Sequence, residues 1–146
     1  MAKVSHKSIV DAPRDVVFAY VNGYENVPKF MFGITRFDPL TEHTAGLGTR
    51  FAAAMNVGPK TLKSTVETME WIENELIRLE AVEGFEANTT WRFADGDGGT
   101  EVHVEFDYRL PGGLAGRALG TVLEPFMGQA VKHTDANLSA QVKELG

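Results

Sequence analysis

Apolar residues between positions 114 and 145 recur at steps of three and four positions. They are Leu119, Val122, Leu123, Phe126, Met127, Ala130, Val131, Leu138, Val142 and Leu145. This spacing predicts one long helix with a broad apolar face. Pro125 cannot donate a hydrogen bond to the Thr121 carbonyl, so we expect the helix to bend or break there. A helix this one-sided needs a large partner surface, and the strand-rich region 50–110 is the only candidate.

The positions before this helix predict one strand, two short helices and then six strands. Residues 3–10 alternate in polarity as a strand does, and Asp11 and Pro13 favour a helix start just after them. Residues 24–32 predict a second short helix. The later strands are expected at 34–40, 49–57, 61–71, 76–82, 87–94 and 100–110. Short glycine-rich turns join them, so neighbouring strands must be antiparallel. The fold class is α+β, with a curved antiparallel sheet of about six or seven strands wrapped on the long C-terminal helix.

Alternation along each strand assigns its two faces. The residues expected to face the helix are Ile77, Leu79, Ala81, Thr89, Trp91, Phe93, Val102, Val104, Phe106, Tyr108 and Leu110. Strand 61–71 is ambiguous. Either Leu62, Ser64, Val66 and Thr68 face inward, or Lys63, Thr65, Glu67 and Met69 do. Trp71 sits near a turn, so we expect it to respond little to any molecule held between the sheet and the helix.

Composition narrows the class of protein. A chain of 146 residues fits one domain, 1–146, and the absence of cysteine excludes disulfides and thiolate chemistry. A formal charge of −6 and a pI near 5.2 disfavour nucleic acid or an anionic membrane as the main partner. No run is apolar enough for stable membrane insertion, and the first ten residues lack a secretory signal. We therefore expect a soluble, cytoplasmic domain.

Candidates for acid–base chemistry are few. His6 shares a strand face with Ser8 and Val10 and is the best catalytic candidate among the histidines, although a structural role is the simpler interpretation. His43 and His103 are most simply surface residues, and His133 is expected at the helix rim. One of Glu67 and Glu70 could point into the space between the sheet and the long helix, because the facing of strand 61–71 is ambiguous. The sequence shows no zinc-helix spacing, phosphate-binding loop or dinucleotide fingerprint, so no metal or cofactor is expected.

Aromatic and methionine residues are the remaining signal. Those considered are Phe30, Met31, Phe32, Trp91, Phe93, Phe106, Tyr108, Phe126 and Met127. In an ordinary domain they would be core. They come, however, from the sheet's inner face, the second short helix and the bent part of the long helix. This distribution favours a pocket between these elements. In that pocket Tyr108, with Arg36 or Thr68, would supply the few polar contacts that orient a ligand.

Four short stretches carry a family resemblance: 10–13 (VDAP), 27–28 (VP), 46–50 (GLGTR) and 98–100 (GGT). Through them the chain resembles the polyketide cyclase/dehydrase branch of the START-like superfamily, also called SRPBCC or Bet v 1-like. The resemblance covers nearly the whole chain. It implies the helix-grip fold, in which an antiparallel sheet grips a long C-terminal helix over an internal cavity.

The aromatic-polyketide cyclases that the chain resembles carry an aromatic platform on the second helix and a Ser-x-Arg pair on a middle strand. Here the platform positions hold Val27 and Pro28, followed by Met31 and Ile34, and the middle strand contains Val66, Glu67 and Thr68. Trp91 matches the tryptophan of the next-to-last strand. The chain keeps the apolar wall but departs from the polar pair, and this departure puts cyclase activity in doubt.

Three functions are therefore weighed. The first is binding or carrying a hydrophobic molecule (a lipid, fatty acyl, sterol-like or polyketide-like compound) between the sheet and the C-terminal helix. The expected ligand contacts are Phe30, Met31, Val66, Thr68, Trp91, Phe93, Phe106, Tyr108, Phe126 and Met127. The second is a polyketide cyclase or dehydratase using His6, Tyr108 and a strand Glu or Arg. The third is an interaction subunit whose segment 24–32 docks another protein.

Overall fold

The computed structural model describes residues 2–31, 33–57, 60–109, 129, 133–134 and 136–142. Its elements in chain order are β1 (Ala2–Val10), α1 (Arg14–Asn22), the 3-10 helix η1 (Tyr24–Asn26), α2 (Val27–Phe30), β2 (Ile34–Pro39), β3 (Arg50–Val57), β4 (Lys60–Ile72), β5 (Leu76–Gly84), β6 (Ala87–Gly96) and β7 (Gly99–Tyr108). This order confirms the prediction of one strand, short helices and six further strands. Most boundaries fall within one or two residues of those expected.

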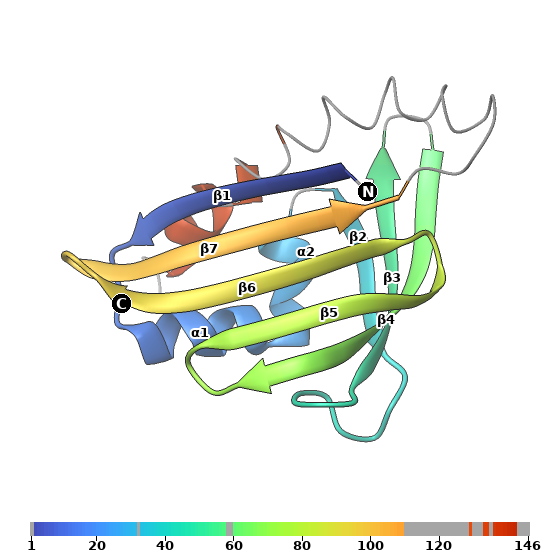
Figure 1. The fold of residues 1–146 in the computed structure, drawn as a ribbon, viewed down its shortest axis with the longest axis horizontal. Helices are drawn as coiled ribbons and strands as arrows, with labels where there is room; N and C mark the ends of the chain where they lie inside the picture. Colours follow the sequence, from blue (N-terminus) through green and yellow to red (C-terminus); the bar gives the residue numbers. More distant parts are fainter. Residues whose placement is uncertain are drawn as a thin grey trace.

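The strands form one antiparallel sheet in the order β1-β7-β6-β5-β4-β3-β2. Strands β2 to β7 follow one another as a meander, whereas β1 comes from the other end of the chain and pairs with β7. Figure 1 shows that the sheet curls strongly, because β2, β3 and the start of β4 run at a steep angle to β1, β7, β6 and β5, and β4 bends to run alongside β5. The short helices lie on one side of this curved sheet, which we call its inner face.

The short helices hold their apolar residues against this inner face. In α1, Val17, Phe18 and Val21 are buried, and the helix contacts β6 and β7. Pro13 precedes α1 with the extended backbone and fixed φ that suit a helix entry. In α2, Val27 and Phe30 are buried and the helix contacts β2. The two helices therefore close part of the space inside the curl.

The described C-terminal residues pack into the same space. Residues 136–142 are helical, and Leu138 and Val142 are fully buried in the main core. The Tyr20 hydroxyl donates to Gln141 Oε1 at 3.1 Å, which ties this helix to α1. The chain therefore has the predicted helix-grip fold, with helix at its C-terminal end against the sheet. The rest of the predicted helix 114–145, including the expected bend at Pro125, lies outside the described residues.

Irregularities in strand pairing decide which side chains face inward. In β2 the register shifts between Ile34 and Arg36, and in β4 it shifts between Thr68 and Glu70. Each shift adds one residue to a strand and reverses the facing of the residues that follow. Ile34 therefore packs against the core while Arg36 is exposed. The β4 bulge turns Trp71 inward, opposite the buried Ile77.

The end of β1 is fixed closely to the start of β7. The Thr100 hydroxyl donates to the Ala12 carbonyl at 2.7 Å, and the Thr100 side chain is fully buried. At Gly99 a Cβ atom would clash with the Val10 carbonyl oxygen, so only glycine fits at this position. These contacts join two segments that are far apart in the sequence, with Thr100 and Ala12 separated by 88 positions.

Candidate ligand-binding site

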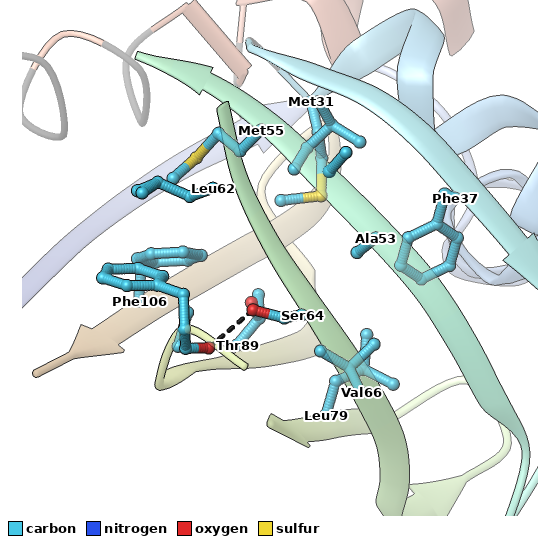
Figure 2. Close-up of a pocket in the computed structure, with 14 residues that line it drawn as sticks. Met31, Phe37, Ala53, Met55, Leu62, Ser64, Val66, Leu79, Thr89 and Phe106 are labelled. Atoms are coloured by element: carbon cyan, nitrogen blue, oxygen red, sulfur yellow. Dashed lines mark hydrogen bonds between the residues drawn. The ribbon is translucent and has the colours of Figure 1, made fainter. Parts of the chain in front are cut away.

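The inner face of the sheet contains a cavity of about 60 Å³, which we call pocket A (Figure 2). It is lined by Met31, Ile34, Phe37, Ala53, Ala54, Met55, Leu62, Ser64, Val66, Leu79, Phe85, Ala87, Thr89 and Phe106. Figure 2 shows Met55, Leu62 and Phe106 grouped on one side of this space and Met31 and Phe37 on the other. The lining is almost entirely apolar, as expected for a site that binds an apolar molecule.

A second cavity of about 40 Å³, pocket B, lies next to it. Its lining is Val21, Asn22, Tyr24, Val27, Phe30, Met31, Phe37, Thr44, Ala45, Gly46, Phe51, Thr68, Trp71, Ile77, Leu79 and Trp91. Pockets A and B share Met31, Phe37 and Leu79, so these three side chains form the wall between them. Phe37 is held in place by stacking on Phe51, with ring centroids 4.4 Å apart. Met31 is the unbranched and most adaptable side chain of this wall.

Polar groups are distributed unequally between the two pockets. Pocket A has the hydroxyls of Ser64 and Thr89, and Ser64 already donates to the Phe85 carbonyl. Pocket B has Asn22, Tyr24, Thr44 and Thr68. The Trp71 indole N–H donates to Asn22 Oδ1 at 3.0 Å. Among the described lining residues of either pocket there is no Asp, Glu, Lys, Arg or His.

The residues expected to contact a ligand divide into three groups. Phe30, Thr68 and Trp91 line pocket B, Val66 and Phe106 line pocket A, and Met31 lines both. Phe93 and Tyr108 line neither: Phe93 packs edge-on against Phe18 in the core, and Tyr108 packs with Phe106 and Met55 in a second apolar cluster. Phe126 and Met127 lie outside the described residues.

Two of the alternatives left open for polar residues do not hold in the described structure. Arg36 does not orient a ligand inside the described cavities, because the β2 bulge turns it to the outer face, where it pairs with Asp38 at 2.6 Å. Neither Glu67 nor Glu70 enters the cavity: Glu67 pairs with Arg50 at 2.6 Å and Glu70 with Arg78 at 2.9 Å. The ambiguity of β4 is thus resolved, with Val66 and Thr68 inward.

Trp71 also differs from expectation. Its position near a turn suggested little contact with an internal ligand, yet it lines pocket B and lies edge-on to Phe18 at 5.7 Å. The β4 bulge explains this position, because an unbroken alternation from Thr68 would turn Trp71 outward. Asn22 and Tyr24 were missed as well. Their position between two predicted helices was the available signal, since polar side chains gather where helices begin and end.

The histidines do not meet in these pockets. His6 lies opposite Val104 in the β1–β7 register and therefore shares the inner face, but it lines neither pocket. His43 and His133 are exposed, and His103 Nε2 lies 3.8 Å from Glu105 Oε1 on the outer face. Within the described residues no group of three or more His, Asp or Glu side chains is placed to hold a metal ion.

A wider depression, about 210 Å³, lies on the outer face of the sheet. It is lined by Arg36, Ala52, Ala53, Ala54, Lys63, Ser64, Thr65, Glu83 and Gly84. The small side chains of Ala52 and Ala54 leave this space, and charged side chains border it. Its lining is therefore chemically opposite to that of pockets A and B.

The sequence from residue 1 to residue 143 matches the model of a family described as polyketide cyclase/dehydrase and lipid transport. The chain belongs to this family. No sequence among the curated proteins matches the chain. Membership agrees with the resemblance inferred from the four short stretches.

In the described part of the chain, no helix is both long and apolar enough to cross a membrane.

Solved structures show the same fold at low sequence identity. A protein from Thermus thermophilus superposes with a TM-score of 0.85 at 20% identity, and the alignment covers 99% of each chain. A START superfamily protein from Mycobacterium smegmatis gives 0.75 at 17% identity over 99% of each chain. The Zhui aromatase/cyclase from Streptomyces sp. R1128 gives 0.78 at 14% identity, covering 97% of this chain and 93% of that one. These three proteins share the architecture of this chain, and at such identities the likeness shows the fold alone.

Proposed function

We propose that this protein binds a hydrophobic small molecule between the inner face of its sheet and the helices that cover it. The observation that carries the proposal is the pair of adjacent apolar pockets sharing Met31, Phe37 and Leu79. Ligand sites are typically concave and mostly apolar, with a few polar groups that fix orientation. The family description, which includes lipid transport, supports the same function.

Both pockets are small, so a ligand larger than a few water molecules must displace side chains of their walls. A water molecule needs about 10–15 Å³ of such space, so cavities of about 60 and 40 Å³ each hold only a few waters. A lipid, sterol-like or polyketide-like molecule therefore has to displace part of the dividing wall. Met31 is partly exposed and has an unbranched, freely rotating side chain, so it is the wall residue that moves most easily.

The two alternative functions receive less support. A cyclase or dehydratase needs acid–base or cationic groups near its substrate, and the described linings of pockets A and B contain no Asp, Glu, Lys, Arg or His, with the phenol of Tyr24 as their one titratable group. An interaction subunit that docks through segment 24–32 needs apolar groups on its surface. In that segment Phe30 is fully buried and Val27 is 6% exposed, so these two side chains face the core and are not available on the surface.

The test fills pocket A from within. Ala53 lines pocket A, while its neighbour Ala52 faces the outer depression, so Ala53→Leu and Ala52→Leu add the same atoms to opposite faces. We expect Ala53→Leu to abolish or strongly weaken binding of an apolar dye, and Ala52→Leu to leave it unchanged. Native mass spectrometry of the freshly purified protein gives a second readout, a co-purifying ligand that Ala53→Leu loses. Equal binding by both variants would contradict the proposal.

A further inference from the structure

The two pockets have chemistry that restricts the ligand further, provided that the proposed function holds. No charged side chain lines either pocket within the described residues, and the charged side chains Arg36, Glu67 and Glu70 form their ion pairs on the outer face. An ionised carboxylate or phosphate buried without a counter-charge is strongly disfavoured relative to a neutral group. The lining thus selects a neutral molecule.

The hydrogen-bonding groups are concentrated at pocket B. The Trp71 indole nitrogen is only a donor, so the Asn22 atom that it meets at 3.0 Å must be the carbonyl oxygen. This contact fixes the amide and leaves Nδ2, with two N–H groups, as the free end. In the described part of the chain, no protein atom accepts a hydrogen bond from this Nδ2.

Two hydroxyls add to this donor. Thr68 is only 3% exposed, and within the described residues its hydroxyl has no hydrogen-bond partner, while its backbone N–H donates to the Thr49 carbonyl. Tyr24 packs its ring 6.3 Å from Phe51 and likewise has no described partner for its phenol group. Pocket A offers fewer hydrogen-bonding groups to a ligand. The Ser64 hydroxyl already donates to the Phe85 carbonyl, so the Thr89 hydroxyl is the polar side-chain group left in its described lining.

The position of pocket B fits a polar group on the ligand. Thr44 and Ala45, which form part of its wall, are exposed, so pocket B reaches the surface of the protein at this loop. We propose that the ligand is a neutral amphipathic molecule whose carbonyl, ether or hydroxyl oxygen accepts hydrogen bonds from Asn22, Tyr24 and Thr68 in pocket B. Its apolar body then extends past Met31 into pocket A.

The test compares three probes by isothermal titration: decanol, decanoate at about pH 8, where the carboxylic acid is ionised, and toluene, which has no hydrogen-bonding group. We expect decanol to bind about tenfold or more tightly than decanoate, since only the charged head loses solvation without compensation. The isosteric variants Thr68→Val and Tyr24→Phe should each weaken decanol binding about three- to tenfold. They should leave toluene binding unchanged.

Two threonine variants are the controls. Thr90→Val alters a buried threonine that lines neither pocket and should leave all three affinities unchanged. Thr89→Val removes the hydroxyl of pocket A and should have little effect on decanol. Weaker decanol binding in Thr89→Val but not in Thr68→Val would overturn the proposed orientation. Equal binding of decanol and decanoate would overturn the neutral class while leaving the proposed function intact. Failure of all three probes to bind would overturn both.

Discussion

The two faces of β7 meet different surroundings although they alternate along one strand. Val102, Val104, Phe106 and Tyr108 are all buried on the inner face. The outer face carries Glu101, His103, Glu105 and Asp107, and its glutamates pair with cations of β1: Lys3 with Glu105 at 3.6 Å and Lys7 with Glu101 at 3.7 Å. The pairs Arg50–Glu67 and Arg78–Glu70 lie on the same outer face of β3, β4 and β5, away from the side that holds the pockets.

The outer charges are arranged as pairs and small networks. Arg78 donates to both Glu70 and Glu80, and the hydrogen bond to Glu70 is the main cause that raises the pKa of the Arg78 guanidinium above its ordinary value. A guanidinium is charged at any pH at which the protein is folded, so this shift adds no pH dependence to stability in the ordinary range. The difference between the two faces indicates that a charged residue on the outer face can be altered at little cost in stability. Placing a charge on the inner face should cost much more.

The largest expected effect comes from placing a charge on the inner face. Val102 is fully buried in the main core, and Val102→Asp should cost more than about 4 kcal/mol of unfolding free energy and prevent stable folding. Ala52→Asp places the same group on the outer face, beside the depression that Arg36 and Lys63 border, and should fold normally. Urea denaturation followed by circular dichroism measures both. A folded Val102→Asp variant would contradict the assigned facing of β7.

The next effect concerns an inner residue that is both core and pocket wall. Trp91 is 2% exposed, lies edge-on to Phe30 at 5.8 Å and lines pocket B. We expect Trp91→Ala to cost about 3 kcal/mol, at the lower end of aromatic-to-alanine changes, because a neighbouring cavity already exists. Trp91→Phe should cost clearly less. The urea midpoints of the two variants measure these losses of stability. If Trp91→Ala loses much less stability than Trp91→Phe, Trp91 is not packed in the core.

A smaller effect is expected where the two pockets meet. Met31 is partly exposed and lines both, so Met31→Ala should cost about 1–2 kcal/mol, less than a fully buried methionine. The truncation should also join the pockets, and therefore strengthen binding of long apolar probes relative to short ones. Thermal unfolding measures the first effect and probe titration the second. Unchanged selectivity for probe length would argue that the pockets are separate sites.

The smallest effect is expected on the outer face. His103 lies 3.8 Å from Glu105, and both side chains are about one-quarter exposed. His103→Ala should change the free energy of unfolding by no more than about 0.5 kcal/mol and leave ligand binding unchanged. A loss of several kcal/mol in the same urea measurement would show that the two faces of β7 are assigned the wrong way round.

Strict alternation made much of the fold predictable from sequence. The pairing register of β6 and β7 has no shift, and Thr89, Trp91, Val102 and Val104 are buried as expected. The meander also follows from short turns, because consecutive strands joined in that way can pair only antiparallel.

The failures occur where the pattern is broken by one residue. Arg36 and Trp71 both follow bulges, and a bulge reverses facing without leaving a clear mark in the residue types. The polar end of the site was hard to foresee for a different reason. Asn22 and Thr68 lie 46 positions apart, and only the folded chain brings both to pocket B. Phe93, an inward aromatic residue expected to contact the ligand, lines neither described pocket and packs edge-on against Phe18.

The pairing of β1 with β7 has a consequence for how the chain reaches this structure. Strands β2 to β7 can zip together as successive hairpins, each closing a short loop, whereas β1 must find a partner about a hundred residues away, as in the pair Ala2 and Tyr108. Closing so long a loop is entropically costly and contacts of this kind slow folding. We therefore expect β1 docking to be the late, rate-limiting event. The hydrogen bond of the fully buried Thr100 to Ala12 and the close contact of Gly99 with Val10 should then form in this last step and hold β1 in place.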